Sequence, residues 1–214
     1  MNGFSTACRL CPRLARHLDG VRETHPRYHA RPVAPFGPAR ARLLIVGLAP
    51  GMHGANRTGR PFTGDHAGIL LYETLHRYGF ASCPVSEHAR DGLRLDGCRI
   101  TNAVKCLPPE NRPLPDEVRR CNGYLRAELE TLPARAAILA LGVVAHGAVL
   151  AALGAKGTAH PFRHGTRHEL ARGIALFDSY HCSRYNTQTR RLTPAMFRGV
   201  FDSIREHLSA ARFR

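Results

Sequence analysis

Four short apolar runs, each followed by a segment of helical character, constrain the fold of this chain more than any other feature. Runs that are apolar throughout are typical of strands buried on both faces of a sheet. Alternation of such strands with helices predicts a single-domain α/β protein, a three-layer α/β/α sandwich around a mainly parallel four-stranded sheet. The expected strands are Leu43 to Gly47, Arg99 to Ala103, Ala137 to Leu141 and Ile174 to Phe177, and the expected helices are Ala67 to Tyr78, Pro115 to Thr131, Val143 to Leu153 and Pro194 to Ala210.

The rest of the chain is organised around this core. With 214 residues, 43% of them apolar, the chain is expected to form one domain with one core. A cysteine-containing segment, 1–21, precedes a basic, proline-rich loop over 22–42. The apolar stretch 136–155 is long enough to span a bilayer, but its glycines divide it into a strand and a helix. The first residues lack the features of an export signal, so we expect a cytoplasmic protein.

The charge of the chain is strongly positive. It has 31 Lys and Arg against 16 Asp and Glu, a formal net charge of +15. Arginine dominates, and its planar guanidinium suits phosphate. Nucleic acid is therefore the first partner to consider, ahead of a membrane, because no amphipathic basic helix stands out. The alternative is that the charge serves only solubility.

Three unusual loops follow the predicted strands. Residues 47–51 read Gly-Leu-Ala-Pro-Gly, Asn102 ends the second strand, and residues 181–186 read His-Cys-Ser-Arg-Tyr-Asn. In a parallel sheet the reactive site lies where the carboxyl ends of the strands emerge. We therefore expect these loops to open onto one crevice.

The seven cysteines are a second pattern. In a reducing compartment they do not indicate disulfides. Cys8 and Cys11 form C-x-x-C, and Cys106 and Cys121 lie far downstream. Four thiolates suit either a structural zinc ion or a 4Fe-4S cluster, and the spacing does not choose between them. The remaining three are expected to be small buried apolar residues: Cys83, Cys98 and Cys182.

Together these segments resemble the type-5 uracil-DNA glycosylases. The resemblance covers nearly the whole chain: the loop 47–51, the segment 54–65 (Gly-Ala-Asn-Arg-Thr-Gly-Arg-Pro-Phe-Thr-Gly-Asp), residues 100–106 around Asn102, and an H-x-S-x-x-N motif at 181–186. It implies a uracil-DNA glycosylase-like fold and a monomeric enzyme of base excision repair. That enzyme flips uracil out of double-stranded DNA and hydrolyses its glycosidic bond, with hypoxanthine, xanthine and ethenocytosine as further substrates.

The resemblance also assigns ligands and binding residues. The ligands of a structural 4Fe-4S cluster fall on Cys8, Cys11, Cys106 and Cys121. The substrate-binding residues fall on Gly47, Ala49, Gly51, Phe62, Asn102 and His181. The DNA-binding residues fall on Ser183, Arg184, Tyr185 and Asn186, with Arg184 or Tyr185 as the wedge that fills the space of the flipped base.

The catalytic assignment is Asp65, His181 and Asn102. The Asn102 amide can both donate to and accept from the edge of uracil. His181 is expected to donate to uracil O2, where negative charge develops as the bond breaks. Leu48 and Ala49 stand where related families commonly carry a carboxylate or an asparagine, so Asp65 becomes the group expected to orient water. Asp65 could instead simply cap the following helix.

Two alternatives follow from the same residues. The first is a zinc-stabilised basic nucleic-acid-binding module without catalysis, which leaves the glycine-rich loops and the segment from Phe62 to Asp65 unexplained. The second is a type-4-like glycosylase restricted to uracil.

Overall fold

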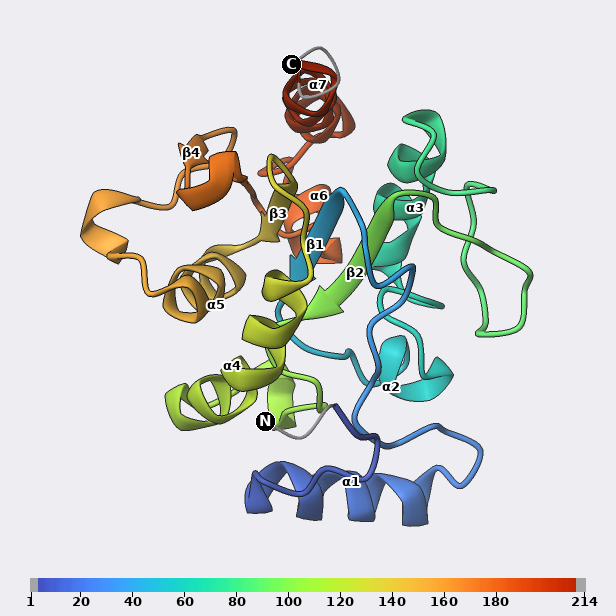
Figure 1. Cartoon of the computed structure of the whole chain (residues 1–214). Helices are drawn as coiled ribbons and strands as arrows, with labels where there is room; N and C mark the ends of the chain where they lie inside the picture. Colours follow the sequence, from blue (N-terminus) through green and yellow to red (C-terminus); the bar gives the residue numbers. More distant parts are fainter. Residues whose placement is uncertain (1–3, 211–214) are drawn as a thin grey trace.

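The computed structural model describes residues 4–210. They form one mainly parallel sheet with helices packed around it (Figure 1). Its strands lie in the order β2-β1-β3-β5-β4, and only β4 is antiparallel to its neighbour. The predicted α/β class and parallel core are confirmed, but the sheet has five strands instead of four. The strands are β1 (Leu43–Gly47), β2 (Cys98–Asn102), β3 (Ala137–Leu141), β4 (Arg167–Glu169) and β5 (Ala175–Ser179).

The sequence did not predict the extra strand or the end of β5, because both contain polar residues and the prediction relied on apolar runs. β4 reads Arg-His-Glu and lies at the edge, where charged side chains are common and pairing is needed on one side only. β5 continues past the apolar run to Asp178 and Ser179, both fully buried. Backbone pairing with β3 therefore extends the strand even where hydrophobicity ends.

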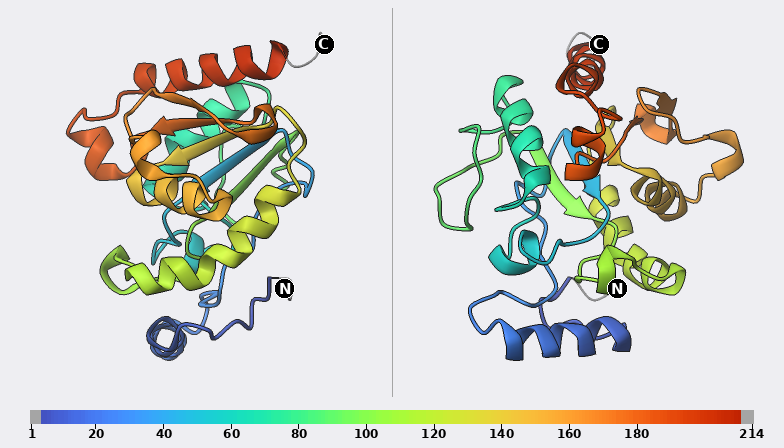
Figure 2. Two further views of the ribbon diagram at one scale, coloured as in Figure 1. Left: turned by 60° about the vertical axis from the view of Figure 1, so that its left-hand side comes forward. Right: turned by 180° about the vertical axis from the view of Figure 1, so that it is seen from behind.

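Helices cover both faces of the sheet, as predicted (Figures 1 and 2). Leu43 and Ile45 belong to the core shared with α3 (His66–Arg77) and α7 (Pro194–Ala210). Leu44 and Val46 point to the opposite face, toward α4 (Pro115–Glu130) and α5 (Val143–Leu153). This alternation is the two-residue period of a strand. All four helices were predicted to within one residue at each end.

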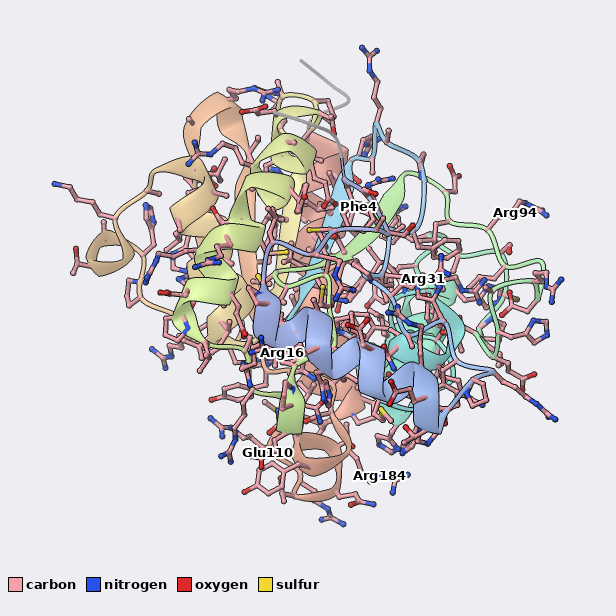
Figure 3. All side chains as sticks on the ribbon, turned by 90° about the horizontal axis from the view of Figure 1, so that it is seen from below. Phe4, Arg16, Arg31, Arg94, Glu110 and Arg184 are labelled. Carbon is pink, nitrogen blue, oxygen red and sulfur yellow. The ribbon has the colours of Figure 1, made fainter. Side chains whose placement is uncertain are left out.

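A helix near the N-terminus, α1 (Pro12–Thr24), was not predicted. Pro12 occupies the first helical turn, where a missing N–H costs nothing, and Leu14, Leu18 and Val21 are buried at helical spacing. The helix runs past the expected start of the loop at residue 22. It packs against Val104 and Leu107, just beyond β2, so it lies across the carboxyl edge of the sheet (Figure 3).

The other short elements lie between the main ones. They are the helices α2 (Ala55–Thr58) and α6 (Arg184–Gln188) and the single 3-10 turns Pro109–Asn111, Gly157–Ala159 and Ala171–Gly173. In the described part of the chain, no helix combines the length and apolar character needed to cross a membrane.

Candidate active site

Gly47 ends β1 and is paired in register with Asn102 at the end of β2. A Cβ atom on Gly47 would lie 2.5 Å from Asn102 Oδ1 and 2.6 Å from Cζ of Phe62. Real side chains do not tolerate such distances, so only glycine lets these groups come together. The first and second predicted loops therefore meet, as expected.

Asn102 carries an unsatisfied buried acceptor. Its side chain is 3% exposed, and Oδ1 has no hydrogen-bond partner. Buried polar atoms are nearly always hydrogen-bonded, so an orphan at a loop edge indicates a place for a ligand donor. In the described residues, the other buried side-chain atoms without a partner are Asn56 Oδ1 and Glu128 Oε2.

Phe62 lies between Gly47 and His181, the first residue of the third loop. Its backbone has a φ of 53°, an outlier for a bulky residue, and its side chain is 6% exposed. Its ring stacks on His181, with centroids 5.7 Å apart and planes inclined by 28°. Strain of this kind is found where function requires a fixed geometry. We call the group Gly47, Phe62, Asn102 and His181 the amide pocket.

His181 is held as a neutral imidazole. Burial lowers the pKa of His181 to about 4. The Asn186 side-chain amide donates to the His181 carbonyl oxygen at 2.8 Å, and Ser183 caps α6 by accepting from the backbone N–H of Asn186. Two of the four predicted DNA-binding residues thus also shape the loop. Arg184 (Figure 3) and Tyr185 are exposed, and Tyr185 is 70% exposed.

Of the two roles that the sequence left open for Asp65, the structure shows the helix cap. Oδ1 accepts from the backbone N–H of Gly68 at 3.0 Å, which caps α3. Oδ2 lies closest to Gly54, where a Cβ atom would clash with it, and a Cβ atom on Gly51 in the first loop would lie 3.6 Å away. Burial raises the pKa of Asp65, and the hydrogen bonds at the helix start oppose that rise. One oxygen therefore caps the helix, and the other lies beside the glycines that follow β1.

Ala49 differs from the other predicted substrate-binding residues, because it packs toward the cysteines with Leu14 and Val104. Cys8, Cys11, Cys106 and Cys121 line one small pocket beneath α1 and α4. Burial raises the pKa of the Cys106 thiol to about 12, and the three neighbouring cysteines add to the rise. A thiol with such a pKa stays protonated at neutral pH, so a bound metal ion or cluster would be needed to stabilise its thiolate. Cys98 and Cys182 are buried elsewhere, as predicted, whereas Cys83 is only half-buried.

A second buried polar group, which we call the histidine network, was not predicted. His146, His168 and Asp178 are all buried, and their ligand atoms lie within 4.8 Å of one another, close enough to hold a metal ion. Asp178 accepts from His146 Nδ1 at 2.7 Å, from His168 Nε2 at 3.0 Å and from the backbone N–H of Arg163 at 3.3 Å. His146 Nε2 donates to the His160 carbonyl oxygen at 2.8 Å. His168 lies on β4 between two exposed residues, but it is itself only 7% exposed and points inward.

An amide oxygen without a partner, an aromatic ring in a fixed place and a neutral imidazole lie together at the edge of the sheet, which is the chemistry expected of a protein that binds a flat heterocycle. Comparison with known proteins makes this class specific. Residues 34–205 match the model of the uracil DNA glycosylase superfamily. The chain therefore belongs to the uracil DNA glycosylase superfamily, and its relatives place it in the type-5 family.

Those relatives cover most of the chain. A type-5 uracil-DNA glycosylase of Thermus thermophilus is 51% identical over 197 residues, which is 90% of each chain. One of Mycobacterium bovis is 46% identical over 94% of this chain and 78% of its own, and one of Pyrobaculum aerophilum is 44% identical over 87% and 82%. A type-4 uracil-DNA glycosylase of Archaeoglobus fulgidus is 40% identical, but over only 45% of this chain.

Proposed function

We propose that the protein hydrolyses the N-glycosidic bond of uracil in double-stranded DNA and leaves an abasic site. The observation that carries this proposal is the buried Asn102 Oδ1, which has no partner beside Gly47 and the ring of Phe62. A base in a duplex is shielded by stacking, so the nucleotide must flip out before this oxygen can reach it. The N3–H of uracil is a donor of the kind that Oδ1 lacks, and the Asn102 NH₂ group pairs with O4.

The same amide permits a wider choice of base. An amide can turn over and exchange its donor and acceptor, so hypoxanthine, xanthine and ethenocytosine are proposed as further substrates. Phe62 supplies a flat apolar surface for any of these rings. A strict uracil enzyme would cleave only the uracil duplex when the four duplexes are compared.

His181 stabilises the departing base. Since its pKa is lowered to about 4, the ring is neutral at pH 7 and can donate one N–H to uracil O2. A preorganised donor of this type is worth about a hundred- to a thousand-fold in rate. The stack with Phe62 fixes the plane of the imidazole before the substrate arrives.

Asp65 Oδ2 and the backbone of the 47–51 loop orient the attacking water. The helix cap holds the carboxylate through Oδ1, which leaves Oδ2 beside Gly54 and Gly51. The ionised carboxylate also stabilises the positive charge that develops on the sugar. Asp65, His181 and Asn102 thus form the proposed catalytic set.

The proposed DNA contacts come from α6 and its cap: Ser183, Arg184, Tyr185 and Asn186. Tyr185 is the most exposed of the large apolar side chains in the described chain, which favours it over Arg184 as the wedge. The chain is proposed to act as a single domain and a monomer on nucleoid DNA in the cytoplasm.

The four cysteines are proposed to hold a structural 4Fe-4S cluster. They come from three separate segments, and two of the sulfur atoms already accept hydrogen bonds: Cys121 Sγ from the backbone N–H of Lys105 at 3.3 Å, and Cys8 Sγ from the Tyr124 hydroxyl at 3.4 Å. Such donors are typical of the surroundings of cluster sulfurs. When bound, the cluster joins the N-terminal segment to α4, and it supplies no redox step.

Cysteine substitution tests the cluster. We expect purified protein to be brown, and Cys121→Ser to lose iron and sulfide. Cys98→Ser is the matched control, because Cys98 is equally buried but lies in the core on the other face of the sheet. A colourless wild-type protein that contains one zinc ion would contradict the cluster and favour a zinc-stabilised module.

Cleavage of a uracil-containing duplex tests the function. The duplex is incubated with the brown protein and then treated with alkali, which breaks the strand at an abasic site. We expect a break at the uracil and none in a duplex with thymine at that position. An intact uracil strand would refute the proposed activity.

A further inference from the structure

Lys105 is buried beside the amide pocket, and the catalytic proposal does not use it. It is 1% exposed, whereas a lysine is almost never fully buried unless its charge is paired. Its Nζ donates to Glu128 Oε1 at 2.6 Å, to the Asn102 carbonyl oxygen at 2.9 Å and to the Thr101 hydroxyl. All three donor positions of the ammonium group are therefore used.

One of these hydrogen bonds fixes the backbone of Asn102, the residue whose side-chain oxygen has no partner. Asn102 is the last residue of β2, and the chain leaves the sheet immediately after it. Its backbone is fixed on the β1 side by register pairing with Gly47, and the next residue, Ala103, donates its N–H to the Gly47 carbonyl oxygen at 2.8 Å. The Asn102 carbonyl oxygen is fixed by Lys105. The position of Oδ1 follows from the position of this backbone.

Glu128 is what makes a charged lysine possible here. Its Oε1 accepts from both Lys105 and the Thr101 hydroxyl, the latter at 3.1 Å. Its Oε2 has no hydrogen-bond partner and lies 3.8 Å from Arg99 Nε, at the end of the strand away from Asn102. A buried ion pair of this kind often contributes little net stability compared with neutral side chains of similar size. Stability alone therefore does not explain why Lys105 and Glu128 are charged residues at these buried positions.

We propose that Lys105 is a positioning residue, which holds the Asn102 backbone so that the side-chain amide meets the flipped base in the reactive orientation. This inference rests on the proposed role of Asn102. Lys105 does not touch the substrate. Misplacement by about 1 Å can cost on the order of a hundred-fold in rate, so a fixed carbonyl oxygen three atoms from the side chain has a direct effect on catalysis.

A double substitution separates positioning from stability. Lys105→Met leaves Glu128 buried without its cation, so this variant is expected to melt at a lower temperature and to cleave slowly for either reason. Lys105→Met/Glu128→Gln removes both charges and should regain much of the melting temperature. We expect its single-turnover excision rate to remain at least about tenfold below that of wild type, with nearly unchanged affinity for uracil-containing duplex, since binding energy from phosphate contacts is not altered.

Arg99→Met is the matched control. It removes the other cation near Glu128 without any contact to Asn102, so we expect the excision rate of wild type. If the double variant cleaves at the wild-type rate, or Arg99→Met slows cleavage as much, Lys105 has no positioning role. Failure of wild-type protein to cleave uracil duplex refutes the proposed function itself and the role of Lys105 with it, which distinguishes the two failures.

Discussion

The amide pocket lies at the ends of β1 and β2, and the histidine network lies on β4, β5 and α5, on the other side of β3. The two groups differ in how their buried polar atoms are satisfied. In the histidine network, both oxygens of Asp178 accept hydrogen bonds, and both ring nitrogens of His146 face oxygens that only accept. In the amide pocket, Asn102 Oδ1 is as deeply buried yet has no partner. A satisfied network stabilises one conformation, whereas an orphan atom is a cost that a ligand can remove. We therefore interpret the histidine network as part of the scaffold and propose the amide pocket as the site.

Breaking the histidine network should produce the largest change in stability. Asp178→Asn removes the carboxylate that accepts from both His146 and His168, and loss of one partner of a buried pair costs about 3–5 kcal/mol of unfolding free energy. Chemical denaturation measures the change. The excision rate of the protein that remains folded at low temperature should be little affected.

Glu169→Gln is the control for this substitution. Glu169 is on β4 beside His168, but its side chain is 61% exposed, so its change should stay within about 0.5 kcal/mol. If Asp178→Asn kept full stability and lost excision instead, the network would belong to the site and the comparison would be wrong.

The amide pocket should respond in the opposite sense. Asn102→Ala should slow single-turnover excision about a hundred- to a thousand-fold, because a preorganised hydrogen-bonding group is lost. Its unfolding free energy should change little, because Oδ1 has no partner to lose.

Asn122→Ala provides the matched amide control. Asn122 Nδ2 donates to the Ala148 carbonyl oxygen at 2.8 Å, between α4 and α5. This variant should lose about 1 kcal/mol of stability and retain the wild-type rate. Equal rate losses in the two variants would show that the orphan oxygen does not mark the site.

The same contrast explains what the sequence could predict. β1, β3, α5 and α7 were predicted at their observed bounds, because apolar periodicity alone defines them. The proposed site residues at loop positions come from their motifs, and their meeting at one edge follows from the parallel sheet. His146, His168 and Asp178 are polar residues far apart in the chain, so only the fold shows that they satisfy one another. Lys105 was missed for the same reason, since its partner Glu128 lies on another element.

A substitution that crowds the amide pocket should slow excision by less than the loss of the Asn102 amide. Gly47→Ala places a methyl group 2.5 Å from Asn102 Oδ1 and forces the amide or Phe62 to move. A displacement of this size should slow excision by about a hundred-fold, measured in the single-turnover assay.

Gly147→Ala in α5 is the matched substitution, because a Cβ atom there meets nothing within 4 Å. This variant should keep the wild-type rate and gain up to about 1 kcal/mol from helix propensity. A Gly47→Ala enzyme of normal rate would mean that the close approach of Gly47, Asn102 and Phe62 is not needed for catalysis.

The smallest effect concerns the pH dependence of His181. Its folded pKa is about 4, below the value of about 6.5 in an unfolded chain. Between these values the unfolded chain binds more protons, so the contribution of this residue to stability is present above about pH 6.5 and is lost as pH falls toward 4. His181→Asn removes that dependence, and the difference between the unfolding free energies of wild type and variant should shrink as the pH falls through this window. The same neutral ring is the proposed donor in catalysis, so the wild-type single-turnover rate should show no inflection near pH 6.5 from this group. An inflection there that disappears in His181→Asn would mean that the imidazole titrates normally, and that the amide pocket does not hold it as a neutral donor.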